Sequence, residues 1–161
     1  MKNFFLSLFL FSGVLISCGE TQDREWGITA EEVRDDKSLK AFVRVAREHL
    51  ETNYEQAVVD FGKEKRWKSE TVYLWSLRKD GSFLFHIQSP VLNGHKFEDS
   101  ETTDKFLTEG FRHGGGFIEY DIDNPAKEGP DRSRKIAYVI PFEREGEEYL
   151  IASGYYPNYK P

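Results

Sequence analysis

Apolar residues recur at helical spacing in the first half of the chain. They fall at i, i+3 and i+4, as on one face of an amphipathic helix, at positions Leu39, Phe42, Val43, Ala46, Leu50, Tyr54 and Ala57. Thr29 and Glu32 have the spacing of a capping box at the start of this segment. The pattern predicts a long helix, continuous or broken near residues 35–38 and extending as far as Phe61, that packs one face against a partner surface.

Apolar and polar residues alternate in the second half of the chain, which is typical of strands. Strands are predicted at residues 72–77, 82–87, 117–122, 134–142 and 148–156. Asp80 and Gly81 favour a type I′ turn between the first two. Both faces of the first strand are apolar, so the sheet is predicted to be covered on both sides. The fold class is therefore α+β, with a long N-terminal helix packed on a roughly five-stranded antiparallel sheet.

Two long connections interrupt the predicted strands. Residues 88–103 form a loop of a length that is uncommon unless it serves a function, such as closing a site. A short helix is predicted at residues 104–111, and the glycines 114–116 then turn the chain into the next strand. That strand is followed by a second loop at residues 123–133.

The N-terminus has the features of a targeting segment. Lys2 precedes an apolar run over residues 4–16 that is too short for a stable transmembrane helix. The following Leu15-Ile16-Ser17-Cys18 resembles the bacterial lipobox. This resemblance implies a signal peptide at residues 1–17, a lipidated Cys18, a tether at residues 18–28 and a domain at residues 29–161. The expected location is the extracytoplasmic side of the bacterial envelope.

The alternative for Cys18 is an ordinary buried thiol; as the chain's single cysteine, it cannot form an intramolecular disulfide. The formal net charge of −6 argues against nucleic acid as a partner, because phosphate binding needs clustered Lys and Arg. The histidines lack metal-ligand spacing, and no nucleophile motif is present. We therefore expect neither an enzyme nor a cofactor.

The segment from residue 38 to residue 157 resembles the single Cache domain, a PAS-like extracytoplasmic sensor module. The resemblance rests on several short groups in the same order: Leu39 to Val43 with Ala46, Ala57 and Phe61; Trp67; Tyr73 to Trp75 with Asp80-Gly81; His86, Pro90, Leu92 and Gly94; Gly115 to Tyr120 with Asn124-Pro125; Lys135 to Val139; and Ser153 to Tyr156. It implies a ligand-binding role toward small organic acids, amino acids or similar metabolites, held between the sheet and the loop-helix excursion. Because this chain carries no signalling domain, a membrane signalling partner is expected.

Seven residues are candidates for ligand contact. His86 could donate a hydrogen bond to a carboxylate and Lys135 could pair with an anion; the alternatives are a core histidine and a solvated strand-end charge. Arg112 could reach over a pocket mouth or lie in solvent. Four aromatic residues could line a pocket or pack the core: Tyr73, Trp75, Tyr120 and Tyr138.

Two functional hypotheses remain open on the sequence. The first is a lipid-anchored ligand-binding sensor that signals through a membrane partner. The second is a structural or interaction lipoprotein that has the same fold and binds no ligand, with its sheet core filled by aromatic side chains.

Overall fold

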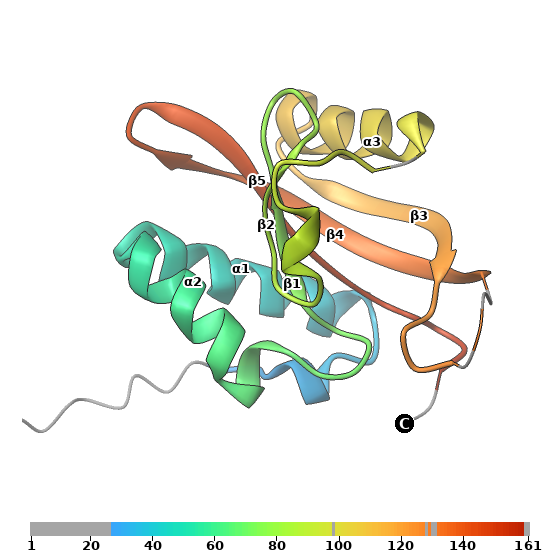
Figure 1. The fold of residues 1–161 in the computed structure, drawn as a ribbon. Helices are drawn as coiled ribbons and strands as arrows, with labels where there is room; N and C mark the ends of the chain where they lie inside the picture. Colours follow the sequence, from blue (N-terminus) through green and yellow to red (C-terminus); the bar gives the residue numbers. More distant parts are fainter. Residues whose placement is uncertain (1–26, 98, 128, 130–131, 160–161) are drawn as a thin grey trace, which may run out of the picture.

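The computed structural model describes residues 27–97, 99–127, 129 and 132–159 of the chain. The proposed signal peptide, Cys18 and most of the tether lie outside these residues. The described part forms helices and a single five-stranded sheet, which confirms the α+β fold class (Figure 1). None of its helices combines the length and apolar character needed to span a membrane.

The sheet is antiparallel throughout, with the strand order β2-β1-β5-β4-β3. Its strands are β1 (Leu74–Leu77), β2 (Phe83–His86), β3 (Gly116–Asp123), β4 (Arg132–Arg144) and β5 (Glu147–Tyr155). All the predicted strands are present, and β4 extends two residues beyond its predicted limits at each end. The last strand in the chain lies at the centre of the sheet, so residues of β5 contact both hairpins.

The predicted long helix is two helices, α1 (Asp36–Thr52) and α2 (Tyr54–Lys63). Asn53 separates them with extended dihedral angles, and its side chain accepts a hydrogen bond from the Gln56 backbone. An asparagine that caps a new helix in this way ends the preceding one. The Thr29–Glu32 capping interaction exists, but it begins a short 3-10 turn, η1 (Ala30–Glu32), and α1 itself is capped by Asp35.

These two helices cover one face of the sheet, as Figure 1 shows. The residues predicted for the apolar stripe, except Tyr54, are buried. They pack on the sheet residues Leu74, Phe85, Tyr138, Ile140, Phe142 and Ile151. This side holds the first hydrophobic core, closed at its end by Trp67.

The opposite face is covered by the excursion between β2 and β3. The predicted helix begins earlier than expected, as α3 (Ser100–Leu107), and continues into a π-helical turn, η4 (Thr108–Arg112). Part of the predicted loop forms η3 (Pro90–Leu92), and Ser82 and Phe83 bridge to this region. A second core lies beneath it, built from Trp75, Leu77, Phe83, Phe106, Ile118, Val139 and Leu150, among others.

The turn prediction at Asp80 and Gly81 is wrong in type. A type I′ turn needs positive φ at both central residues, but Asp80 lacks it and only Gly81 has it, at 83°. The Asp80 carboxylate instead accepts hydrogen bonds from the Ser82 backbone and hydroxyl. Successive positive φ values occur in the β4–β5 hairpin, at Glu145 (54°) and Gly146 (80°).

Candidate functional site

Lys135 lies on β4 and points toward the second core, where its cross-strand neighbour is Tyr120. The side chain is completely buried. Its Nζ lies over three aromatic rings, 3.9 Å from the centroid of Tyr73, 4.9 Å from Tyr156 and 5.1 Å from Trp75. Among the described residues, Nζ has no hydrogen-bond partner. The amine is therefore enclosed by ring faces, and no carboxylate of the described residues pairs with it.

Burial without a counterion changes the protonation of this amine. Desolvation penalises the charged form and lowers the pKa of Lys135 to about 7. A buried amine without a hydrogen bond also costs stability, on the order of 1–3 kcal/mol for a polar group. A ligand that accepts a hydrogen bond from Nζ would remove this penalty.

His86 lies at the end of β2, next to the same rings. Its Nδ1 accepts a hydrogen bond from the Ser89 backbone N–H at 2.9 Å, so the ring proton of the neutral imidazole resides on Nε2. Burial, followed by the nearby charge of Lys135, lowers the pKa of His86 to about 4. Its ring centroid is 5.2 Å from that of Tyr73 and 6.2 Å from that of Trp75. At neutral pH this side chain is an uncharged hydrogen-bond donor.

Two further buried donors lack hydrogen-bond partners in the described chain. Trp75 is 1% exposed, and within the described chain its indole Nε1 lacks a hydrogen-bond partner. Asn124, just after β3, is 2% exposed, and its Nδ2 likewise has no hydrogen-bond partner among the described residues. Buried donors are normally satisfied, so this set of unpaired donors favours a bound acceptor.

Tyrosine hydroxyls complete the surroundings of Lys135. Burial raises the pKa of Tyr73 to about 12 and that of Tyr120 well above its ordinary value. The Tyr156 hydroxyl donates to the Asp123 carbonyl at 3.0 Å, which fixes its ring beside Nζ. These phenols stay neutral at physiological pH and cannot serve as counterions for the ammonium.

Gly154 on β5 makes room for the lysine stem. A Cβ at this position would lie 2.9 Å from Cε of Lys135 and 2.8 Å from the carbonyl oxygen of Ile136. A glycine within a strand often marks such a close approach. The position of the amine among the rings therefore depends on the missing side chain of Gly154.

A cavity of about 520 Å³ adjoins this cluster. Its apolar lining includes Phe83, Phe97 and Ile122, and its charged lining includes Lys96, Asp99, Asp121, Asp123 and Arg132. His86 and Tyr120 also border it, whereas the fully covered Lys135 does not. The volume is within the usual range for small-molecule sites, and His86 and Tyr120, which border the cavity, also belong to the cluster around Lys135.

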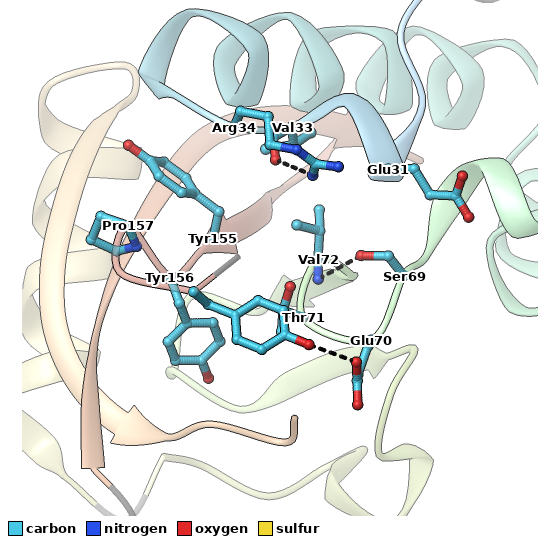
Figure 2. A pocket seen from close by; sticks show the side chains of 11 residues that line it. Glu31, Val33, Arg34, Ser69, Glu70, Thr71, Val72, Tyr155, Tyr156 and Pro157 are labelled. Carbon is cyan, nitrogen blue, oxygen red and sulfur yellow. Dashed lines mark hydrogen bonds between the residues drawn. The ribbon is translucent and has the colours of Figure 1, made fainter. Parts of the chain in front are cut away.

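A second hollow, of about 410 Å³, lies between the start of the domain and its last residues (Figure 2). Here the Tyr159 hydroxyl donates to Glu70, Arg34 donates to the Val33 carbonyl, and the Val72 backbone donates to Ser69. Because these polar groups already have partners, this hollow is less suited to a polar ligand than the surroundings of Lys135. Tyr156 lines this hollow, and its ring also contacts Nζ of Lys135.

Five of the seven predicted site residues lie together: Tyr73, Trp75, His86, Tyr120 and Lys135. The structure does not bring the other two to this cluster. Tyr138 faces the helices, where its ring contacts Phe117 and the Lys40 ammonium. Arg112 borders a separate hollow with Lys79 and Glu148.

Two residues of the cluster were not anticipated: Tyr156 and Gly154. Gly154 gave a usable signal, because glycine inside a predicted strand indicates close backbone approach. Tyr156 is the last residue of the predicted strand 148–156, and nothing in the alternation marked it as a site residue.

Comparison with known proteins identifies the fold family. The family model of the Cache domain matches residues 40–159, which are most of the chain. The chain belongs to the Cache family. This confirms the resemblance found in the sequence. No curated protein matches the chain significantly.

Solved structures of several sensor domains resemble this Cache domain. A Cache chemosensory domain studied for carboxylic acid recognition has a TM-score of 0.60 at 18% identity, covering 74% of this chain and 91% of its own. A methyl-accepting chemotaxis protein from Vibrio parahaemolyticus has a TM-score of 0.60 at 14% identity, and the match covers 76% of this chain and 88% of that protein's chain. The periplasmic sensor domain of a chemotaxis protein has a TM-score of 0.55 at 17% identity, covering 74% and 88%. At these identities the likeness establishes a shared fold.

Proposed function

We propose that this Cache domain is a sensor that binds a small carboxylate in the cluster around Lys135. The observation that carries the proposal is a fully buried amine that has no carboxylate partner in the described chain, next to the unpaired indole N–H of Trp75. A carboxylate accepts several charge-assisted hydrogen bonds at once. It would supply the acceptor that these donors lack, with His86 Nε2 as a further donor.

The arrangement favours an organic acid over an amino acid. The groups around Nζ are donors and neutral phenols, and they offer no carboxylate for a ligand ammonium group. An amino acid would have to reach Asp121 or Asp123, which border the adjoining cavity. The similar Cache domain that was studied for carboxylic acid recognition agrees with this choice.

Location and output are part of the same proposal. Cys18 would carry lipid and hold the domain at the extracytoplasmic side of the envelope, and a membrane protein would receive the signal. Cells expressing the full chain or Cys18→Ala test the anchor. The full chain should partition into the detergent phase and the variant into the aqueous phase; equal partitioning would contradict the anchor.

A thermal-shift screen of the purified domain tests ligand binding. The panel should contain acetate, propionate, pyruvate, malate and representative amino acids. A ligand at 100 times its dissociation constant should add about 2.7 kcal/mol to the free energy of unfolding. Lys135→Met should abolish this stabilisation. Lys40→Met is the matched control, because Lys40 also lies over a tyrosine ring, but on the helix-covered face.

If no compound of a broad panel stabilises the protein, the ligand-binding proposal fails. The ligand-free structural or interaction lipoprotein would then be the better description. One observation favours that second candidate: the aromatic rings around Lys135 pack against one another and leave its amine outside the cavity.

A further inference from the structure

The amine of Lys135 has a chemical capability that pairing with a carboxylate does not use. A neutral amine is a nucleophile, and a lysine that is desolvated in an apolar pocket is activated in this way. The pKa of Lys135, lowered to about 7 by burial, leaves a large neutral fraction at physiological pH. The lone pair is also free of hydrogen bonds within the described residues, since Nζ has no partner there.

We propose that Lys135 captures small carbonyl compounds, in particular 2-oxo acids, as a reversible imine within the aromatic cluster. The proposal rests on the proposed carboxylate site and names a narrower ligand class for it. The cluster offers what such a ligand needs: donors for its carboxylate, in Trp75 Nε1 and His86 Nε2, and an amine for its keto carbon.

The reaction is balanced without any oxidant or reductant. The Nζ lone pair forms a bond to C2 of the 2-oxo acid, and the carbonyl π electrons move to oxygen, which takes up a proton. A proton then passes from nitrogen to the hydroxyl group of the resulting carbinolamine, and the C–O bond breaks to release water as the freed nitrogen lone pair forms C=N. The protonated imine keeps one positive charge, which the ligand carboxylate neutralises and the rings of Tyr73 and Tyr156 contact.

Enclosure favours the captured state. Water hydrolyses an imine, and Lys135 is completely covered by the rings around it. His86 and Tyr120 border the cavity and also belong to the cluster around Lys135, so we expect a ligand in the cavity to approach Nζ past these side chains. Lys79 has no such setting, because it is exposed and pairs with Glu148 at 3.1 Å.

Reductive trapping tests the proposal on the wild-type domain. The protein is incubated with pyruvate or glyoxylate and cyanoborohydride, and then analysed by intact mass and peptide mapping. We expect a single adduct on Lys135, with an added mass equal to that of the acid less one oxygen atom. It should form at least tenfold faster than on exposed lysines, and acetate should slow it. No adduct at Lys135, or equal labelling of exposed lysines, would overturn the proposal.

The outcomes separate this inference from the proposed function. Stabilisation by acetate or propionate with no adduct from pyruvate would overturn the imine and leave the carboxylate site supported. An adduct at Lys135 that carboxylates do not compete with would support the reactive amine and count against a carboxylate site. Lys135→Arg, which keeps the charge and cannot form an imine, should lose the adduct.

The pH dependence of trapping gives an independent readout that does not require a variant. The titratable groups facing Nζ are His86 and the hydroxyls of Tyr73, Tyr120 and Tyr156. The pKa of His86 is lowered to about 4 and that of Tyr73 is raised to about 12, and burial also raises those of Tyr120 and Tyr156. None of them titrates between about pH 6 and 8. Adduct formation should rise severalfold over this interval as the amine loses its proton, and a flat profile would contradict the inference.

Discussion

The two faces of the sheet differ in how their buried and half-buried ionisable groups are paired. On the helix side, His49 of α1 contacts the Asp60 carboxylate of α2 at 2.8 Å and stacks on Trp67. On the other side, Lys135 and His86 lie among aromatic rings, and neither contacts a carboxylate of the described chain. The first arrangement pairs an imidazole with a carboxylate within the fold, whereas the second costs stability, and the proposed ligand site would account for that cost.

This difference teaches where to look for function in a fold of this kind. Both faces are equally apolar in the sequence, and both bury large aromatic residues. What distinguishes them is the buried lysine, because an ionisable group that is fully buried without a charged partner in the described chain is typical of functional sites. Four experiments can break or sharpen the contrast.

Removing a core side chain from the helix side should have the largest effect. Phe42 is fully buried and packs against Trp67, with ring centroids 5.9 Å apart. Phe42→Ala should lower the free energy of unfolding by about 3–5 kcal/mol, the usual cost of such a cavity. Urea denaturation measures this loss in the free energy of unfolding. Val59→Ala is the control, because Val59 of α2 is 43% exposed, and it should change stability by less than about 0.5 kcal/mol.

The pH dependence of stability should reveal the unpaired amine. Since the folded pKa of Lys135 is about 7, below the ordinary value of 10.5, the unfolded chain binds more protons between these values. The free energy of unfolding should therefore rise with pH, by up to about 1.4 kcal/mol per unit between about pH 7 and 9. Lys135→Met should flatten this rise. An equal slope in wild type and variant would show that the amine is paired or hydrated.

The same variant should be more stable than wild type near pH 7. Methionine fills a similar volume and carries no polar group, and replacement of an unsatisfied buried group by an apolar one is often stabilising. We expect a gain of about 1–3 kcal/mol in the free energy of unfolding, measured by urea denaturation without added ligand. The sign is opposite to that of Phe42→Ala. A loss of stability would mean that Lys135 contributes to the fold and would remove the contrast between the faces.

Much of this architecture could be read from the chain, because alternation and helical spacing depend on the burial of single faces. The break at Asn53 was missed, since the apolar stripe continues across it at the right spacing and only the cap reveals it. The turn at Asp80 was misassigned because its type depends on hydrogen bonds to Ser82. For the candidate site residue Tyr138, strand periodicity could not indicate which face of the sheet its side chain occupies, since both faces are apolar.

Two glycine-to-alanine substitutions give the smallest but most closely matched comparison. At Gly154 the new methyl group would meet Cε of Lys135 and the Ile136 carbonyl, so stability should fall by about 1–3 kcal/mol through overpacking. Gly62 lies within α2 and has open space at its Cβ position, so the same change there should raise stability by up to about 1 kcal/mol through helix propensity. Thermal denaturation measures both. Gly154→Ala should also weaken carboxylate stabilisation, because it displaces the amine, while Gly62→Ala should leave it unchanged. If both variants bind alike, the position of Lys135 does not determine recognition, and the cavity bordered by His86 and Tyr120 is sufficient on its own.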